Sequence, residues 1–412
     1  MTQPVFHAIE HCRICGGQDL DEVIDVGNQA LTGRFPRSDE ADPPSAPMVL
    51  VRCRECGLVQ LRDSVHLDEL FTENYGYRSG LNATMARHLA GVVSSVAERV
   101  ALQPGDIVLD IGCNDGTLLS NYPDGVVKVG IDPLVDKFHS FYPKDYRVSA
   151  AFFQRDSFCQ LVPDQRAMAI TSIAMFYDLE NPGVFVSDIA HCLAPDGVWV
   201  LEQSYMPLML QHNSYDTICH EHIEYYALRQ IDTLVEAHKM RVFDVALNDS
   251  NGGSFRLFVC HEDAPYATSA AVTTMRRGEA EAGLNGPAPF QAFRQRCERM
   301  RDDLRAFVER EVANGKVFHL YGASTKGNTI LQYCGLTSRL IAAAADRNPE
   351  KWGSVTPGTR IPIISEEQSR TERPDYYLVL PWHFRSEFLE REAGYRASGG
   401  KMIFPLPEFE IC

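Results

Sequence analysis

The segment at residues 108–116, Val-Leu-Asp-Ile-Gly-Cys-Asn-Asp-Gly, constrains the fold of this chain more than any other stretch. Its apolar start predicts a buried strand ending near Asp110, and Gly112 and Gly116 predict a loop before a helix that begins near Thr117. Glycines let the backbone approach a ligand closely, and loop amides at a helix N-terminus can serve its polar groups. The spacing differs from the dinucleotide fingerprint, so the loop alone leaves open S-adenosylmethionine, another nucleotide or a structural turn.

The next strand narrows this choice. Residues 126–132 read Val-Val-Lys-Val-Gly-Ile-Asp, and an acid at that place in a doubly wound sheet can bind the two ribose hydroxyls of a nucleoside. This acid strengthens the case for an adenosyl ligand such as S-adenosylmethionine, and the residues expected around it are Asp110, Gly112, Asn114, Gly116, Asp132 and Pro133.

The sequence that follows alternates between the two kinds of regular structure. Residues 168–173 are an apolar run suited to a buried central strand, and residues 182–193 predict a helix. A Leu-x-Pro-x-Gly turn then enters an apolar strand that ends near Glu202. This alternation predicts an α/β unit with a parallel sheet.

Length and composition set the outer bounds. A chain of 412 residues is expected to form about two or three domains. The net charge of −16 argues against a nucleic-acid partner or an anionic membrane surface. We find no apolar run of about 18 residues and no N-terminal signal pattern, and the 12 cysteines lack the density of a disulfide scaffold. A cytoplasmic protein is therefore expected.

Four cysteines form two Cys-x-x-Cys pairs, each followed by glycine. Four thiolates in two short-spaced pairs suit a closed, tetrahedral and structural zinc site. The alternative is a set of unrelated core cysteines, and a redox role would need only one pair. The predicted zinc ligands are Cys12, Cys15, Cys53 and Cys56.

The densest group of acid and base side chains is at residues 214–226, beyond the predicted fifth strand. His220 and His222 can accept protons near neutral pH, and Glu221 can orient an imidazole. The two histidines lack the i, i+4 spacing of a helical metal site. We favour an acid/base site over a metal site or a structural hydrogen-bond cluster.

An aromatic, turn-rich segment at residues 71–80 precedes a helix predicted over residues 83–100. Tyr75, Tyr77 and Ser79 either cover a ligand or cap the core of the next domain, and the sequence favours neither interpretation.

A second strand, glycine loop and helix unit begins at residue 317, after a charged helical stretch at residues 290–314 that we interpret as a solvated bridge. The loop at residues 322–328, Gly-Ala-Ser-Thr-Lys-Gly-Asn, offers hydroxyls, a lysine and a helix N-terminus to a pyrophosphate. A strand ending at Asp346 repeats the pattern of a nucleotide domain. The alternative is a duplicated fold that holds no ligand.

Taken together, these motifs resemble the nucleotide-sugar C-methyltransferase family, whose members act on 4-keto-deoxysugars. The resemblance covers essentially the whole chain. It implies an α/β protein in which a zinc-binding unit (1–66) precedes a class I, Rossmann-like methyltransferase domain (67–245). A second Rossmann-like domain (246–412) would help to bind the nucleotide. The implied reaction is methylation of the carbon beside the keto group through an enolate.

The resemblance also implies roles for individual residues. His222 would be the base and Glu221 would orient it. The catalytic group would comprise His222, Glu221, Tyr77, Tyr75, His220 and Tyr177. Ser79 would join the residues around the methyl donor. The nucleotide-linked sugar would contact Tyr321, Ser324, Lys326, Asn328 and Asp346.

The chain departs from the family pattern at two positions. Cys219 stands where a tyrosine is usual, and Met-Phe-Tyr-Asp at 175–178 lacks a usual histidine. Both changes remove groups that polarise a keto oxygen, and Tyr177 or His220 is the hypothetical substitute. O-methylation of a similar small molecule and a non-catalytic nucleotide-binding or S-adenosylmethionine-binding module are the alternative functions. We expect a monomer.

Overall fold

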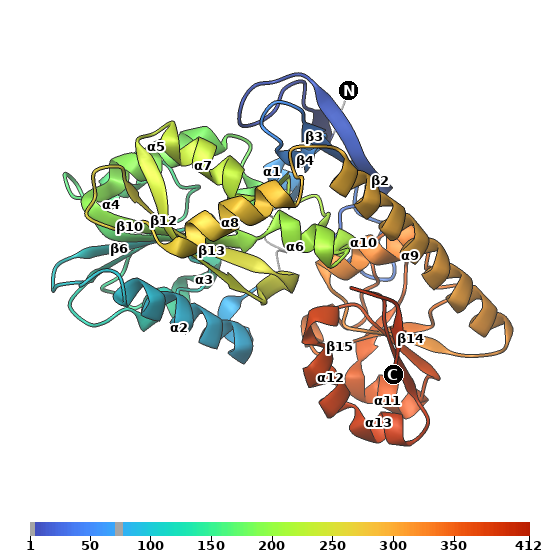
Figure 1. Cartoon of the computed structure of the whole chain (residues 1–412). Helices are drawn as coiled ribbons and strands as arrows, with labels where there is room; N and C mark the ends of the chain where they lie inside the picture. Colours follow the sequence, from blue (N-terminus) through green and yellow to red (C-terminus); the bar gives the residue numbers. More distant parts are fainter. Residues whose placement is uncertain (1–4, 71–76) are drawn as a thin grey trace.

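The computed structural model describes residues 5–70 and 77–412, which form an N-terminal unit, a central sheet with its helices and a C-terminal α/β unit (Figure 1). The α/β architecture predicted from the alternating motifs is confirmed, with two mixed sheets that each contain five parallel strands. Tyr75 lies outside the described residues.

The N-terminal unit is built from antiparallel strands. Its strands are β1 (Phe6–Ala8), β2 (Leu20–Ala30), β3 (Ser45–Cys53), β4 (Val59–Leu61) and β5 (Asp63–Val65). β1 pairs with β5, and the larger sheet has the order β11-β4-β3-β2. Its outer strand β11 (Glu224–Tyr225) comes from the Glu-His segment far along the chain. A short helix α1 (Leu67–Leu70) ends the unit, and α2 (Ala83–Ala97) leads into the central sheet.

The central sheet has the strand order β12-β13-β10-β9-β6-β7-β8. The strands are β6 (Ile107–Ile111), β7 (Val127–Ile131), β8 (Arg147–Ser149), β9 (Ala167–Ile173), β10 (Leu193–Ser204), β12 (Met240–Asn248) and β13 (Ser254–His261). Five neighbouring strands, β8, β7, β6, β9 and β10, run parallel to one another. β13 is antiparallel to both of its neighbours, β10 and β12. Every residue of β6 is buried, as expected for a strand covered on both faces.

Helices pack around this sheet (Figure 1). They are α3 (Val135–Phe138), α4 (Arg155–Leu161), α5 (Pro182–Cys192), α6 (Met206–Gln211), α7 (Leu228–Glu236) and α8 (Ala270–Glu281). The boundary predicted between residues 245 and 246 falls inside β12, and the sheet continues through β13 to His261.

One predicted element is wrong. The helix expected to begin near Thr117 is replaced by a single 3₁₀ turn, Leu119–Asn121. Tyr122 precedes Pro123 and takes an extended conformation, with φ −70° and ψ 148°. A residue before proline is forced out of the helical region by the proline ring, so the helix cannot continue there. The glycine loop is therefore not backed by a helix.

The long helix α9 (Ala288–Ala313) connects the central part of the chain to the C-terminal unit (Figure 1). The C-terminal helices are α10 (Thr325–Cys334), α11 (Glu366–Glu372), α12 (Arg385–Arg391) and α13 (Ala393–Ala397). The strands are β14 (Phe318–Tyr321), β15 (Ala343–Asp346), β16 (Ile363–Ser365), β17 (Tyr376–Val379), β18 (Lys401–Phe404) and β19 (Glu410–Ile411), in the order β16-β15-β14-β17-β18-β19. The chain order reverses between β14 and β17, so ligands are expected at the carboxyl ends of these two strands.

Helix α10 ties the three units together. Asn328 donates from Nδ2 to the carbonyl of Thr32 over 2.7 Å, and Gln332 accepts from the amide of Ala30 over 2.8 Å. Thr329 donates to the carbonyl of Ile218, which lies just before the Glu-His pair, over 2.7 Å. The start of α10 therefore meets both the N-terminal unit and the Glu-His segment.

Candidate functional site

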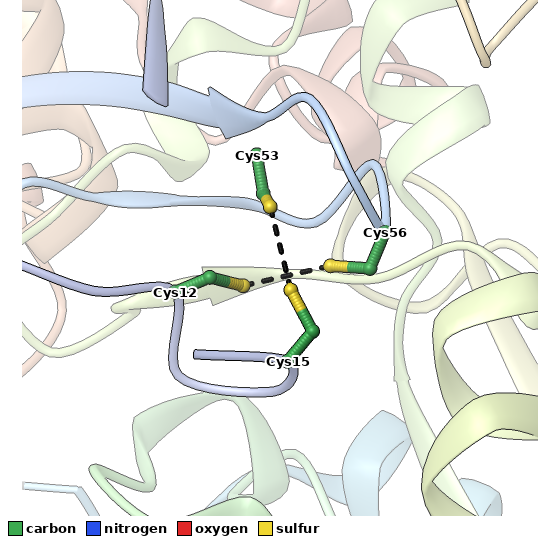
Figure 2. A group of neighbouring side chains, drawn as sticks. All are labelled: Cys12, Cys15, Cys53 and Cys56. Carbon is green, nitrogen blue, oxygen red and sulfur yellow. Dashed lines mark hydrogen bonds between the residues drawn. The ribbon is translucent and has the colours of Figure 1, made fainter. Parts of the chain in front are cut away.

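The four predicted zinc ligands lie together. Their sulfur atoms are all within 4.8 Å of one another, and Figure 2 shows the four side chains pointing toward a common centre. Glycines with positive φ, Gly16 (72°) and Gly57 (79°), close each knuckle by donating backbone hydrogen bonds to the carbonyls of Cys12 and Cys53. Four thiolates with no open position are the donor set of a structural Zn²⁺ site.

The zinc knuckle reaches the central unit through Arg13, which lies between two of the ligands. Its side chain is 3% exposed and donates to the carbonyl of Leu61 (2.9 Å) and to Oε1 of Gln60 (3.1 Å). Nε of Arg13 also lies 3.4 Å from Oε2 of Glu180, which lines the main cavity. The position of the cavity rim is thus linked to the metal unit.

A cavity of about 570 Å³ opens at the carboxyl ends of β6, β7, β9 and β10. This volume suits a nucleoside-sized ligand. Eight predicted site residues line it: Tyr77, Ser79, Asp110, Gly112, Asn114, Asp132, Pro133 and Tyr177. Gly116 supports the loop from behind, where a Cβ atom would lie 2.9 Å from the ring of Tyr142.

The carboxyls at the two strand ends organise the loop. Asp132 accepts from the amides of Asn114 (2.9 Å) and Leu134 (2.7 Å), and Asp110 accepts from the hydroxyl of Thr171 (2.6 Å). Burial, assisted by the charge of Asp132, raises the pKa of Asp110 to about 7 despite the Thr171 hydrogen bond. Burial also raises the pKa of Asp132. Both groups can accept from hydroxyl or ammonium groups of a ligand.

Asn114 and Asp115 hold the segment at residues 77–80 against the loop. Asn114 accepts from the amide of Ser79 over 2.9 Å and donates to the carbonyl of Tyr77 over 3.3 Å. Asp115 accepts from the amide of Gly80 over 3.0 Å. Asp115 was not among the residues predicted from the sequence, although its place between two loop glycines is typical of an acid that organises a loop.

His222 has a defined tautomer. A carbonyl oxygen only accepts, so Nδ1 of His222 donates to Thr217 over 3.1 Å, and the lone pair remains on Nε2. The ring of His222 packs on that of Tyr177, with centroids 4.2 Å apart, and the amide of Ile223 donates to the Tyr177 carbonyl over 2.9 Å. Burial, and then the charge of Lys326, lower the pKa of His222 to about 3, so the imidazole is neutral at neutral pH.

The two neighbours of His222 face the N-terminal unit. Glu221 accepts from the hydroxyl of Thr32 over 3.5 Å, and burial raises its pKa. His220 is 1% exposed and donates from Nε2 to the carbonyl of Ala46 over 3.2 Å. Burial lowers the pKa of His220 to about 4. His220, Glu221 and His222 are not among the described residues that line the cavity, whose wall at this point is formed by Tyr177.

The C-terminal loop meets the cavity through Lys326. Its Nζ donates to the carbonyl of Asn251, a cavity-lining residue, over 3.0 Å. Burial lowers the pKa of Lys326, an effect that the charge of Asp216 opposes. Ser324 caps α10 by accepting from the amide of Gly327 over 3.0 Å.

Three predicted sugar-binding residues have internal partners. The hydroxyl of Tyr321 donates to Glu392 over 2.7 Å and accepts from Nε of Arg391 over 2.7 Å. Asn328 holds Thr32, and Asp346 accepts from the amides of Ala323 and Asn348, each over 2.8 Å. These side chains shape the loop that carries Lys326.

The cavity wall contains polar residues that were not predicted from the sequence to be part of the site. Glu202 pairs with Nε2 of His88 and accepts from Nε of Arg256 over 2.7 Å, and Ser250 lies 3.2 Å from Nδ1 of His88. Burial raises the pKa of Glu202, but the His88 hydrogen bond and the Arg256 charge outweigh it and leave the pKa lowered. Glu202 could have been found from its place at the fifth strand end. No local sequence pattern around His88 predicts that its side chain lies in the cavity wall.

Family models match three parts of the chain: a zinc binding domain at residues 12–71, a methyltransferase domain at 82–242 and a C-methyltransferase C-terminal domain at 249–407. Fold and site thus define an S-adenosylmethionine-dependent methyltransferase with a class I core and a structural zinc unit. The C-methyltransferase NovU of Streptomyces niveus is 32% identical over 418 residues, which span 98% of this chain and 97% of that protein. The chain belongs to this C-methyltransferase family.

Solved structures match less than half of the chain. A magnesium protoporphyrin IX methyltransferase of Synechocystis is 13% identical, with a TM-score of 0.32 over 43% of this chain and 79% of the other. An S-adenosylmethionine-dependent methyltransferase of Clostridium acetobutylicum is 12% identical, with a TM-score of 0.33 over 43% and 92%. Within the described residues, none of the helices has the length and apolar character that a membrane crossing needs.

Zinc removal tests the metal unit. We expect about one zinc per chain in the purified protein and its loss in Cys56→Ser, because a closed site needs all four thiolates. Loss of zinc should loosen the N-terminal sheet and abolish methyl transfer, since β4 of that sheet pairs with β11. Metal analysis and thermal unfolding measure both effects. Cys412→Ser is the matched control, and unchanged zinc content in Cys56→Ser would contradict the site.

Gly116→Ala tests the loop against Gly105→Ala. Both glycines have positive φ (76° and 93°), but only the Cβ at residue 116 meets another side chain. Each substitution should destabilise the protein by about 1 kcal/mol through backbone strain, and Gly116→Ala by a further 1–3 kcal/mol or so through overpacking. Thermal unfolding should show the larger loss of stability for Gly116→Ala. Titration with S-adenosylhomocysteine should show weaker binding for this variant alone. Equal behaviour of the two variants would contradict the packing argument.

Proposed function

We propose that this C-methyltransferase methylates the carbon alpha to the ketone of a nucleotide-linked keto-deoxysugar. The observation that carries the proposal is the position of Lys326. This lysine belongs to the loop after β14, at the order reversal of the C-terminal sheet, yet its Nζ contacts Asn251 in the wall of the cavity. A cation at this junction suits a diphosphate that connects a nucleotide to a sugar.

Two buried atoms near Lys326 support a polar ligand at this junction. Oδ1 of Asp216 and Nδ1 of His383 have no hydrogen-bond partner in the part of the chain that the structure describes. Burial, followed by the charge of Lys326, lowers the pKa of His383 to about 3. Buried polar atoms are rarely left without partners, so these two atoms favour a ligand that supplies them.

The methyl donor would be held by Asp110, Gly112, Asn114, Asp132 and Pro133, which line the cavity. S-adenosylmethionine supplies an electrophilic methyl group on a sulfonium, and the lowered pKa of Glu202 keeps a negative charge in the same cavity wall. Its adenosyl hydroxyls suit Asp132, since carboxylates at this strand end accept from ribose.

In the proposed reaction His222 is the base. Nε2 carries the lone pair, and the neutral ring can take the proton from the carbon beside the ketone. Burial makes the resulting imidazolium unfavourable, as the lowered pKa shows. The Thr217 carbonyl orients the ring, and an ionised Glu221, the adjacent residue, would offset this cost, so we assign Glu221 to stabilising the charged form of His222.

His222→Asn tests the base. The wild-type enzyme with S-adenosylhomocysteine should exchange solvent deuterium into the alpha position of a nucleotide-linked 4-keto-6-deoxysugar, and His222→Asn should slow this exchange by about 100- to 10,000-fold. Mass spectrometry measures both rates. His261→Asn is the control, since His261, the last residue of β13, contacts the carbonyl of Leu193 on β10. Methylation of oxygen without exchange at carbon would overturn the assignment.

Lys326→Met tests the nucleotide side. The KM for the nucleotide-linked sugar should rise about tenfold to a hundredfold, because a hydrogen bond to a charged group contributes about 1.5–3 kcal/mol. Affinity for S-adenosylhomocysteine should not change. The control is Lys316→Met, which removes a surface ion pair with Asp375 at the opposite end of β14. A KM rise of equal size in both variants would contradict the role of Lys326.

A further inference from the structure

Two side chains in the described cavity wall contain buried polar atoms that are not satisfied by hydrogen bonds. Among the described residues that line the cavity, only Asp178 and Gln203 carry buried polar atoms without a hydrogen-bond partner: Oδ1 of Asp178, and both Oε1 and Nε2 of Gln203. Gln203 is 1% exposed. An unsatisfied buried polar group costs about 1–3 kcal/mol, so these atoms indicate a ligand that completes them.

Both residues lie where a parallel sheet binds its ligands. Gln203 belongs to β10, and Asp178 ends the 3₁₀ turn Phe176–Asp178 that follows β9. β9 and β10 are neighbouring parallel strands, with Glu202 opposite Ile173, so the two residues share the carboxyl edge of the sheet. Tyr177, the neighbour of Asp178, packs on His222. Asp178 therefore directly follows the residue that packs on the proposed base.

The chemical states of the two groups make both of them donors. Burial, followed by the charges of Glu221 and Glu224, raises the pKa of Asp178 well above its usual value, which favours the protonated form of its carboxyl. A protonated carboxyl in an apolar site donates a strong hydrogen bond. The amide nitrogen of Gln203 carries two N–H groups.

We propose that the carboxylic acid of Asp178 and the amide of Gln203 donate hydrogen bonds to the carbonyl oxygen of the methyl acceptor. This inference rests on the proposed function, because it requires a keto acceptor. When the alpha C–H bond breaks, its proton passes to Nε2 of His222 and its electron pair forms the carbon–carbon double bond. The carbonyl π pair moves to the oxygen, where the two donors stabilise the enolate.

This assignment replaces the earlier hypothesis that Tyr177 or His220 polarises the ketone. The Nε2 proton of His220 is already used by the carbonyl of Ala46, and His220 does not occur among the described cavity-lining residues. Tyr177 remains as the wall on which His222 packs.

The first experiment needs no acceptor. Infrared spectra of the wild-type protein at pH 7 should contain the carbonyl stretch of a protonated carboxylic acid that is missing from Asp178→Asn. If the two spectra do not differ in this band, Asp178 is ionised and the inference is overturned, whatever the enzyme methylates.

The second experiment measures deuterium exchange into the alpha position of the nucleotide-linked 4-keto-6-deoxysugar with S-adenosylhomocysteine bound. Asp178→Ala and Gln203→Met should each slow exchange by about 100- to 1,000-fold, as for the loss of one oxyanion donor. Asp178→Asn keeps an N–H donor and should exceed Asp178→Ala by at least about tenfold. Affinity for S-adenosylhomocysteine should not fall in any variant, and Gln203→Met, which removes two unpartnered buried atoms, should not lower the unfolding temperature.

The possible outcomes distinguish a failure of the donor pair from a failure of the proposed function. Equal loss in Asp178→Asn and Asp178→Ala would mean that Asp178 acts as a carboxylate, and would overturn the inference while leaving the proposed function intact. Parallel losses of S-adenosylhomocysteine affinity or stability would mean a structural role and would also overturn it. Wild-type protein that neither exchanges nor methylates any keto sugar would overturn the proposed function first, and the donor pair with it.

Discussion

The backbone pairing between β4 and β11 is the constraint on which the site depends. Glu224 and Tyr225 pair with Gln60 and Val59, and the amide of Leu61 donates to the Ile223 carbonyl over 2.8 Å. β11 begins two residues after His222, so its register fixes which way the Glu-His segment faces. A slip of one residue would reverse alternate side chains. The zinc unit, which orders the loops flanking β4, is therefore part of the site.

A second constraint is the control of charge in the wall of the cavity. Glu202 and Asp178 follow neighbouring parallel strands but have opposite environments. His88 and Arg256 outweigh burial at Glu202 and keep its pKa low, whereas burial with two nearby carboxylates raises that of Asp178. Two carboxyls whose pKa values are pushed apart can take different chemical roles in one cavity. An anion then suits the sulfonium donor, and a neutral acid suits a developing enolate.

Local patterns in the sequence predicted the parts of the site that depend on short spacing. The pairs around Cys12 and Cys53 and the loop from Asp110 to Gly116 lie where they were expected, because neighbours in the chain fix their geometry. The helix predicted near Thr117 was wrong, since Pro123 forces Tyr122 into an extended conformation in which the helix cannot continue. The domain boundary predicted near residue 245 falls inside β12. The pairing of β12 with β13 can be seen only in the folded sheet.

By itself, then, the sequence determined the zinc ligands, the strand and loop that begin the central sheet, and the family resemblance. Only the tertiary structure decided which polar side chains face the cavity. Tyr321 is satisfied by Arg391 and Glu392, whereas two atoms of Gln203 have no partner among the residues that the structure describes. A hydrogen bond across the fold depends on long-range packing, and residue type alone does not report whether a partner is within reach.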